Sequence, residues 1–187
     1  MSEVRGAVIW FTGLPGSGKT TVARGVEKQL REMGYRVELL DGDEVRKWLS
    51  PEAGFTREDR ERHLIRVAYV AKLLARNGVL TICSFVSPYR NIRQRVRRII
   101  EEEVPFIEVY VKCSLEECIR RDPKGLYKRA LRGEIKYMTG IDDPYEEPIR
   151  PEITIDTEHE TIDSCIVKIL NDLKRLNIIT HKSYHKD

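Results

Sequence analysis

Short apolar runs and longer amphipathic stretches alternate along the whole chain. The apolar runs are too short for buried helices, and they predict strands at residues 7–11, 36–41, 79–83, 106–111 and 153–156. The clearest amphipathic stretch is 57–77, whose apolar positions recur with the period of a sheet-facing helix: Leu64, Val67, Ala68, Ala71, Leu74 and Ala75. Strands that alternate with helices are typical of βαβ units, so the sequence predicts an α/β fold with a parallel sheet flanked by helices.

A glycine-rich loop follows the first predicted strand and leads into a helix predicted over 21–30. It fits the pattern G-x4-G-K-S/T, in which backbone N–H groups and the helix N-terminus face a phosphate chain. Lys19 would reach the β- and γ-phosphates of a nucleotide, and the Thr20 hydroxyl would ligate Mg²⁺. A glycine-rich turn with a chance lysine is the alternative, which the flanking strand and helix disfavour. We therefore predict a P-loop NTPase-type sheet and an ATP site formed by Gly13, Leu14, Pro15, Gly16, Ser17, Gly18, Lys19, Thr20 and Thr21.

Polar residues also follow the second and third predicted strands, where functional residues of open α/β sheets collect. Asp43 is the favoured partner for Mg²⁺, whereas Asp41 could equally cap a short helix at 44–49. The loop 84–90 ends in Arg90, which could meet an anion. Most of the arginines in the following helix are expected on a solvated face.

Residues 122–152 are long, rich in charge, glycine and proline, and poor in hydrophobic periodicity. Such a segment is either a disordered insert or a mobile lid, and its many basic residues favour the lid. A basic lid suits a kinase, because phosphoryl transfer depends on positioning and charge neutralisation with water excluded. The guanine motif N-K-x-D of GTPases is absent from the sequence. From the residues alone we predict a small P-loop kinase with an anionic or phosphorylated acceptor, with an NTPase coupled to a partner as the other class.

Composition narrows the picture only slightly. A length of 187 residues suggests one domain, and a formal charge of +3 does not indicate a nucleic-acid partner. Four cysteines without metal spacing predict reduced, mostly buried thiols in a cytoplasmic protein. We expect no signal peptide and no membrane span. Histidines near the C-terminus, in 181–185, could bind metal but are more simply a frayed end.

Five segments in order resemble the adenylylsulfate kinase (APS kinase) family. They are Asp41-Gly42-Asp43-Glu44-Val45-Arg46, Gly54-Phe55-Thr56-Arg57-Glu58-Asp59-Arg60, Phe85-Val86-Ser87-Pro88-Tyr89-Arg90, Arg121-Asp122-Pro123-Lys124-Gly125-Leu126-Tyr127-Lys128 and Thr139-Gly140-Ile141-Asp142-Asp143-Pro144-Tyr145-Glu146. The resemblance runs from the first strand to about Thr157. It implies transfer of the γ-phosphoryl group of ATP to the 3′-hydroxyl of adenosine 5′-phosphosulfate, with Mg²⁺, in sulfate assimilation. A kinase for another small acceptor, such as a nucleoside or sugar acid, is the alternative, and a homodimer is left open.

The same resemblance assigns the acceptor site. It places Arg46, Arg60 and Lys124 on the phosphosulfate and Asp43 near Mg²⁺ and the 3′-hydroxyl. Phe55 would stack on the adenine, and Val86 and Ser87 would line the site. Three residues depart from the family pattern. His63 replaces the family's usual Asn, Ile65 its usual Arg and Met138 its usual Phe. His63 and Met138 would lie at the acceptor.

Ser87 matches a serine that family descriptions label as a phosphoserine intermediate. No base is evident beside Ser87 in the sequence, and in-line transfer needs no covalent step. We therefore expect direct transfer from ATP to the acceptor.

Overall fold

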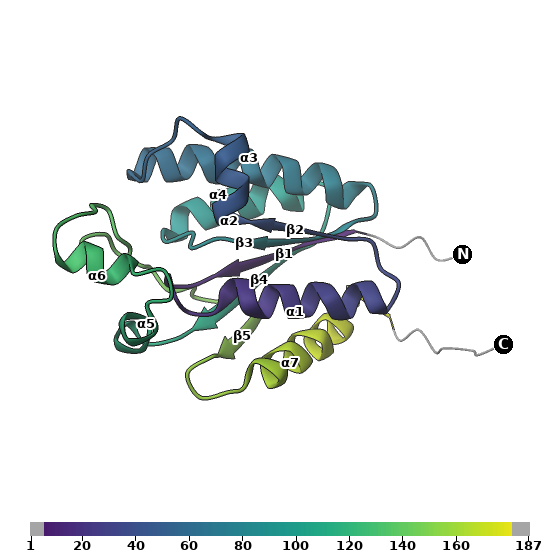
Figure 1. Cartoon of the computed structure of the whole chain (residues 1–187). Coiled ribbons are helices and arrows are strands. Elements are labelled where there is room, and N and C mark those ends of the chain that lie inside the picture. Colours follow the sequence, from purple (N-terminus) through teal and green to yellow (C-terminus); the bar gives the residue numbers. More distant parts are fainter. Residues whose placement is uncertain (1–5, 181–187) are drawn as a thin grey trace.

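The computed structural model describes residues 6–180, and a parallel sheet with the strand order β2-β3-β1-β4-β5 forms its centre (Figure 1). The strands are β1 Ala7–Thr12, β2 Val37–Asp41, β3 Leu80–Ser84, β4 Phe106–Lys112 and β5 Ile153–Asp156. All four pairings of neighbouring strands are parallel. The α/β fold and all five predicted strands are confirmed, with ends that shift by one residue or not at all.

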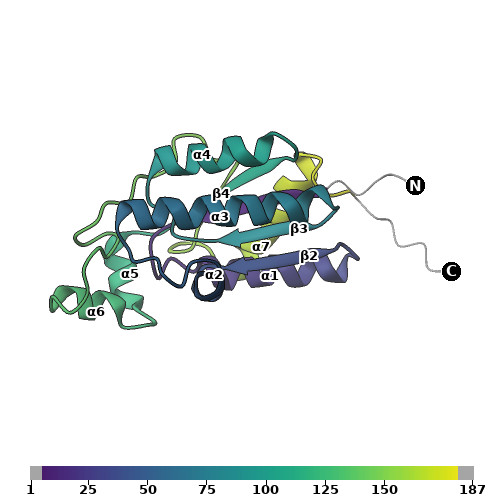
Figure 2. The same ribbon diagram turned by 90° about the horizontal axis from the view of Figure 1, so that it is seen from above.

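Helices cover both faces of this sheet (Figures 1 and 2). The long helices are α1 Lys19–Glu32, α3 Arg57–Arg76, α4 Arg90–Glu101 and α7 Ile162–Arg175. Successive side chains of β1 point to opposite faces, so Ile9 and Phe11 pack with α1 and α7, and Trp10 packs with α3 and α4. Because both faces of β1 are buried, this strand holds the start of the glycine-rich loop in place at the carboxyl end of the sheet.

Short helices and side-chain caps shape the end of the sheet at which the strands terminate. The short helices are α2 Gly42–Leu49, α5 Leu115–Arg121 and α6 Leu126–Leu131. Thr56 caps α3 and Ser114 caps α5, each accepting a hydrogen bond from the backbone N–H three residues on. The Ser114 N–H donates to Glu158, so Glu117 does not complete a capping box at α5.

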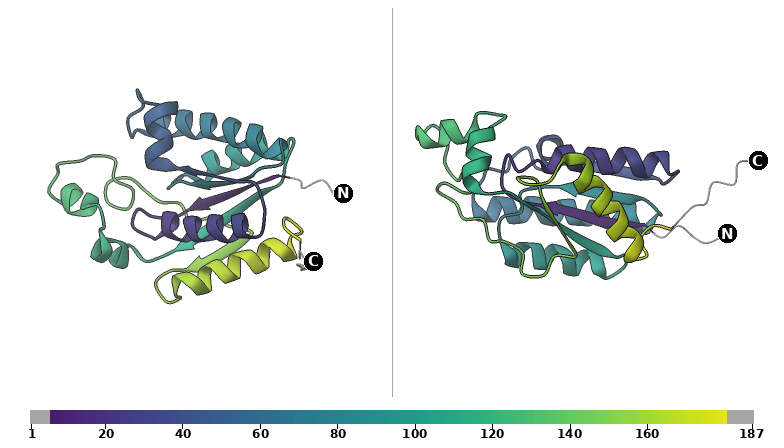
Figure 3. Two further views of the ribbon diagram at one scale, coloured as in Figure 1. Left: turned by 45° about the vertical axis from the view of Figure 1, so that its right-hand side comes forward. Right: turned by 90° about the horizontal axis from the view of Figure 1, so that it is seen from below.

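The segment 122–152 extends beyond the carboxyl ends of the strands, together with α5 (Figure 3). It contains α6 and otherwise lacks regular structure, apart from a bridge between Thr139 and Asp143. A small apolar cluster with Cys118, Tyr127 and Met138 at its centre anchors it. In the structure the predicted lid therefore has its own helix and its own buried base.

Several expectations from the sequence concern which side chains are buried. All four cysteines are buried, and none of the helices within residues 6–180 is long and apolar enough to cross a membrane. Most arginines of α4 were expected on a solvated face, and Arg93 is an exception because it is only 3% exposed. The histidine-containing tail at 181–185 lies outside the described residues.

Candidate active site

The glycine-rich loop connects β1 to α1 and depends on two unusual glycines. Gly18 has φ +86°, a left-handed conformation that costs other residues energy, and it forms the N-cap of α1. A Cβ at Gly13 would lie 2.6 Å from the Val111 carbonyl oxygen of the neighbouring strand, so no larger residue fits there. Tyr127 donates to the Pro15 carbonyl and Thr157 to the Ser17 carbonyl, which ties the loop to the lid and to the end of β5.

Lys19 is buried within this loop. Its Nζ donates to the carbonyl oxygens of Gly13 and Leu14 at 2.9 and 2.7 Å, and it lies 3.4 Å from Ser17 Oγ. Burial lowers the pKa of Lys19 from 10.5 to about 8. Because neutral dipoles only partly replace water, an arriving phosphate would stabilise the charged form of this lysine.

The carboxyl end of β2 presents its two aspartates in different settings. Thr20 Oγ1 donates to Asp41 Oδ2 at 3.0 Å and lies 3.3 Å from Ser84 Oγ. Asp41 also caps α2, accepting from the Asp43 N–H. Asp43, by contrast, has a largely exposed carboxylate that forms an ion pair with Lys124 of the lid. The sequence analysis favoured Asp43 for Mg²⁺, but it is Asp41 that lies beside Thr20.

These residues fit a magnesium ion in the chemistry of their donors. A hydroxyl and a carboxylate in contact, at the mouth of a phosphate-binding loop, supply the oxygen ligands that Mg²⁺ takes, with the remainder coming from phosphates and water. Thr20 and Asp41 would hold such an ion, and Asp43 lies two residues away along the chain.

A single cleft of about 1400 Å³ runs over the carboxyl ends of the strands. It exceeds the usual size of a pocket for one small ligand, which is about 300–1,000 Å³, so a donor and an acceptor can lie in it together. All the predicted acceptor residues line this cleft: Asp43, Arg46, Phe55, Arg60, His63, Val86, Ser87, Lys124 and Met138. From the predicted ATP set, Pro15, Gly16, Gly18, Lys19, Thr20 and Thr21 line it, while Gly13, Leu14 and Ser17 do not.

Two guanidinium groups meet on one aromatic ring in this cleft. The Cζ atoms of Arg46 and Arg60 lie 4.5 and 5.5 Å from the centre of the Phe55 ring. Arg60 also donates to the Phe55 carbonyl and, through its other nitrogen, to the Tyr137 carbonyl of the lid. Burial lowers the pKa of both arginines from the ordinary value, and the charge of Asp143 partly opposes this for Arg60. Two desolvated cations beside an exposed ring form a receptor for an anion attached to a flat group.

Ser87 does not have the surroundings of a nucleophile. Its Oγ accepts a hydrogen bond from the Trp10 indole N–H at 3.0 Å, and the residue is 3% exposed. Its φ of +47° is strained for a residue with a side chain. Neighbouring Val86 is held by its carbonyl, which accepts from Thr12.

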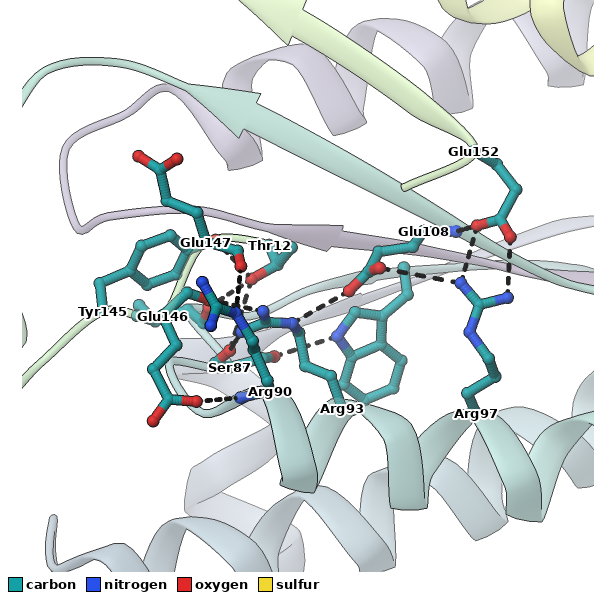
Figure 4. A network of polar contacts seen from close by, with 12 residues as sticks. Thr12, Ser87, Arg90, Arg93, Arg97, Glu108, Tyr145, Glu146, Glu147 and Glu152 are labelled. Carbon is teal, nitrogen blue, oxygen red and sulfur yellow. Dashed lines mark hydrogen bonds and ion pairs between the residues drawn. The ribbon is translucent and has the colours of Figure 1, made fainter. Parts of the chain in front are cut away.

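Arg93 maintains this strained backbone (Figure 4). Its guanidinium donates to the Ser87 carbonyl at 2.6 Å, to the Glu146 carbonyl at 2.5 Å and to Glu108 Oε1 at 3.0 Å. The loop after β3 and the strap at 139–147 are thus joined through one buried cation. The sequence analysis missed this role because arginines at nearly every second position of α4 masked the buried one.

Lid residues reach the cleft from two directions. Lys124 pairs with Asp43 at its edge, whereas Met138 is 7% exposed and belongs to the apolar cluster at the lid base. Phe55 remains 53% exposed, although the guanidinium groups of Arg46 and Arg60 lie against its ring. Arg121 also lines the cleft and donates to the Thr157 carbonyl. No sequence pattern predicted this contact.

A phosphate-binding loop at the end of β1, a magnesium-compatible pair beside it and a basic lid over one cleft define a P-loop kinase. Comparisons with known proteins are more specific. The family model for adenylylsulphate kinase matches residues 5–156, so the chain belongs to the adenylylsulphate kinase family.

Individual relatives agree with this assignment. A probable adenylyl-sulfate kinase of Aeropyrum pernix is 62% identical over 160 residues, covering 85% of this chain and 87% of the relative. The adenylyl-sulfate kinase of Halothermothrix orenii is 51% identical over 179 residues, or 96% and 95% of the two chains. The solved structure of the Mycobacterium tuberculosis APS kinase CysC in complex with AMPPNP and APS superposes with a TM-score of 0.88 at 40% identity, covering 91% of this chain and 98% of that one.

Proposed function

We propose that this protein transfers the γ-phosphoryl group of ATP to the 3′-hydroxyl of adenosine 5′-phosphosulfate, giving ADP and 3′-phosphoadenosine 5′-phosphosulfate. The observation that carries the proposal is the shared cleft. The P-loop with Lys19 and the cluster of Arg46, Phe55 and Arg60 line one cavity large enough for two nucleotides. Family membership and the related structure that holds an ATP analogue and APS support the same reaction.

On the donor side, the P-loop from Gly13 to Thr21 would bind the triphosphate of ATP. Lys19 would move from its carbonyl partners to the β- and γ-phosphate oxygens and neutralise the charge that develops there. Thr20 and Asp41 would hold Mg²⁺, with Asp43 near it. The bound ion would neutralise phosphate charge and orient the γ-phosphate.

On the acceptor side, Arg46 and Arg60 would bind the phosphosulfate, and Phe55 would contact the adenine. Lys124 now pairs with Asp43 and would exchange this partner for the acceptor's anion as the lid closes. That exchange would free the Asp43 carboxylate to accept the proton of the 3′-hydroxyl.

Ser87 would position the acceptor without carrying the phosphoryl group. Its hydroxyl accepts from Trp10, and its backbone is fixed by Arg93. A covalent step would require Ser87 Oγ to lose a proton in a buried site, and its side-chain partner among residues 6–180 is the Trp10 N–H, which can only donate. Direct in-line transfer requires only that Val86 and Ser87 hold the acceptor in line with the γ-phosphate.

The deciding experiment compares APS, AMP, adenosine and gluconate as acceptors with ATP and Mg²⁺ under one condition. The readouts are ADP release in a coupled assay and chromatographic identification of the product. We expect turnover with APS and a product phosphorylated at the 3′ position. Efficient turnover of adenosine or gluconate without APS activity would instead favour a nucleoside or sugar-acid kinase, and no turnover of any acceptor would indicate a non-catalytic nucleotide-binding protein.

Three further parts of the proposal can be tested separately. We propose that residues 1–187 form one kinase domain around the single described sheet, which cooperative unfolding would support. A cytoplasmic location is supported by four buried free thiols and is testable by cell fractionation. The homodimer is a hypothesis to be tested by light scattering.

A further inference from the structure

Two buried nitrogens in the acceptor half of the cleft have no hydrogen-bond partner among the described residues. They are Nε of Arg46 and Nε2 of His63. Both residues line the cleft, and the His63 ring is only 3% exposed. A buried polar nitrogen that folding leaves unpaired is costly, so such a pair indicates that a ligand oxygen completes the site. What His63 can offer that oxygen depends on which ring nitrogen carries the proton.

The other ring nitrogen is engaged inside the protein. His63 Nδ1 lies 2.9 Å from Ser50 Oγ, and Ser50 is 1% exposed. Ser50 Oγ is also 3.2 Å from Arg66 Nη1, which can only donate. Arg66 Nη1 lies nearer to the Glu52 carboxylate (2.5 Å) and the Leu49 carbonyl (2.9 Å), so its two protons are shared among three acceptors. Because Arg66 cannot accept, His63 Nδ1 is the one partner of Ser50 Oγ among the described residues that can take the hydroxyl proton. His63 Nδ1 therefore accepts a hydrogen bond from the Ser50 hydroxyl.

The ring is also kept neutral. Burial lowers the pKa of His63 to about 4, with further lowering from the charges of Arg46 and Arg66 and a smaller opposing contribution from Glu52. A neutral ring that accepts at Nδ1 must carry its proton at Nε2. Glu52 in turn accepts from Arg66 at 2.5 Å, which fixes the guanidinium that begins the chain of hydrogen bonds.

We propose that Ser50 is a positioning residue for the kinase reaction: with Arg66 it fixes His63 as a neutral Nε2–H donor to an oxygen of the acceptor. The inference rests on the proposed function, because it assigns the occupant of that position to the acceptor. It gives the departure from the family's usual Asn a physical meaning. A neutral imidazole tautomer supplies a single N–H donor, and the residue that selects the tautomer lies 13 positions earlier in the chain.

Nitrogen NMR of the imidazole rings tests the tautomer directly. In the ¹⁵N-labelled full chain at pH 7, with His63→Gln used to assign the signals, we expect a protonated Nε2 and an unprotonated Nδ1. APS should shift the Nε2 signal, and AMPPNP alone should leave it in place. An Nδ1–H tautomer or an imidazolium in the free protein would overturn the inference.

Kinetics test the positioning role. Ser50→Ala should produce a mixture of tautomers and raise KM for APS about tenfold, the scale of one hydrogen bond to a charged group, while KM for ATP stays within about twofold. Combining Ser50→Ala with His63→Leu should add little to the effect of His63→Leu alone.

Thr81→Val is the matched control. It deletes another buried hydroxyl, one that has no hydrogen-bond partner among the described residues and lies outside the cleft. Thr81→Val should leave both KM values unchanged. An unchanged KM for APS in Ser50→Ala would refute the positioning role.

Failure of the proposed function and failure of the role of Ser50 give different results. Absence of APS turnover by the wild-type protein would refute the proposed function, while the tautomer of the free protein would still decide the inference. If Ser50→Ala failed to fold, the wild-type NMR measurement would decide it alone.

Discussion

Arg93→Met should be among the most damaging single substitutions outside the P-loop. Arg93 is 3% exposed and donates three hydrogen bonds, to Glu108 and to the carbonyls of Ser87 and Glu146. Methionine fills similar space but leaves the Glu108 carboxylate, itself 8% exposed, without its closest cation. Removing one partner of a buried ion pair costs about 3–5 kcal/mol. At about 2–4 °C per kcal/mol for a chain of this size, the melting temperature should fall by about 6–20 °C.

The destabilisation should depend on pH in a stated direction. Burial already raises the pKa of Glu108 above 4.5 despite the charges of Arg93 and Arg97, and losing Arg93 would raise it further. A carboxyl group whose pKa is higher in the folded state than in the unfolded state binds more protons in the folded state at pH values between the two pKa values. The variant should therefore lose stability as pH rises above about 4.5, and most of the loss should be complete at the raised folded pKa.

Urea denaturation followed by circular dichroism between pH 5 and 8 measures both effects. Arg95→Met is the matched control, since Arg95 is on the same helix in an exposed pair with Glu61 and should cost less than about 1 kcal/mol. Adding Glu108→Gln to Arg93→Met removes the unpaired charge and should restore part of the stability. A cost below about 1 kcal/mol for Arg93→Met, or a cost independent of pH and of Glu108→Gln, would refute the reasoning.

Five other expectations concern activity and nucleotide binding. Lys19→Ala should reduce kcat by about 10²-fold or more with little loss of fold, and a variant retaining over about a tenth of wild-type kcat would contradict the role. Because the pKa of Lys19 is about 8 in the free protein, binding of AMPPNP should take up protons and weaken as pH rises above 8, which calorimetry in buffers of different ionisation heat measures. Asp43→Asn should depress kcat far more than it changes KM for ATP; normal kcat with a raised KM would count against it. Ser87→Ala should keep substantial activity, and a trapped phosphoserine that turns over at the catalytic rate would overturn direct transfer. Arg60→Ala should lower kcat/KM for APS by about 10²-fold while adenosine, which lacks the anion, is barely affected; an unchanged value with APS would argue against the phosphosulfate site.

Features carried by contiguous sequence were predictable. The strands and helices follow from hydrophobic periodicity, and the P-loop from one unbroken motif whose glycines have steric reasons. The burial of Met138 and the separate helix α6 in the lid were not predictable, since 122–152 has no period to indicate its buried side. There the packing of Tyr127 onto the P-loop decides the structure.

Contacts across the sheet explain the rest. The register of β2 on β3 pairs Asp41 with Ser84, and both meet Thr20 from α1, so three segments distant in the chain form one polar group. Asp43 leaves this group because α2 begins at Gly42 and turns its side chain toward the lid. The choice between the two aspartates thus depends on where a helix starts, which is the least certain part of any prediction from sequence. Asp41 is the aspartate in direct contact with Thr20, whereas Asp43 is the one paired with Lys124 of the lid.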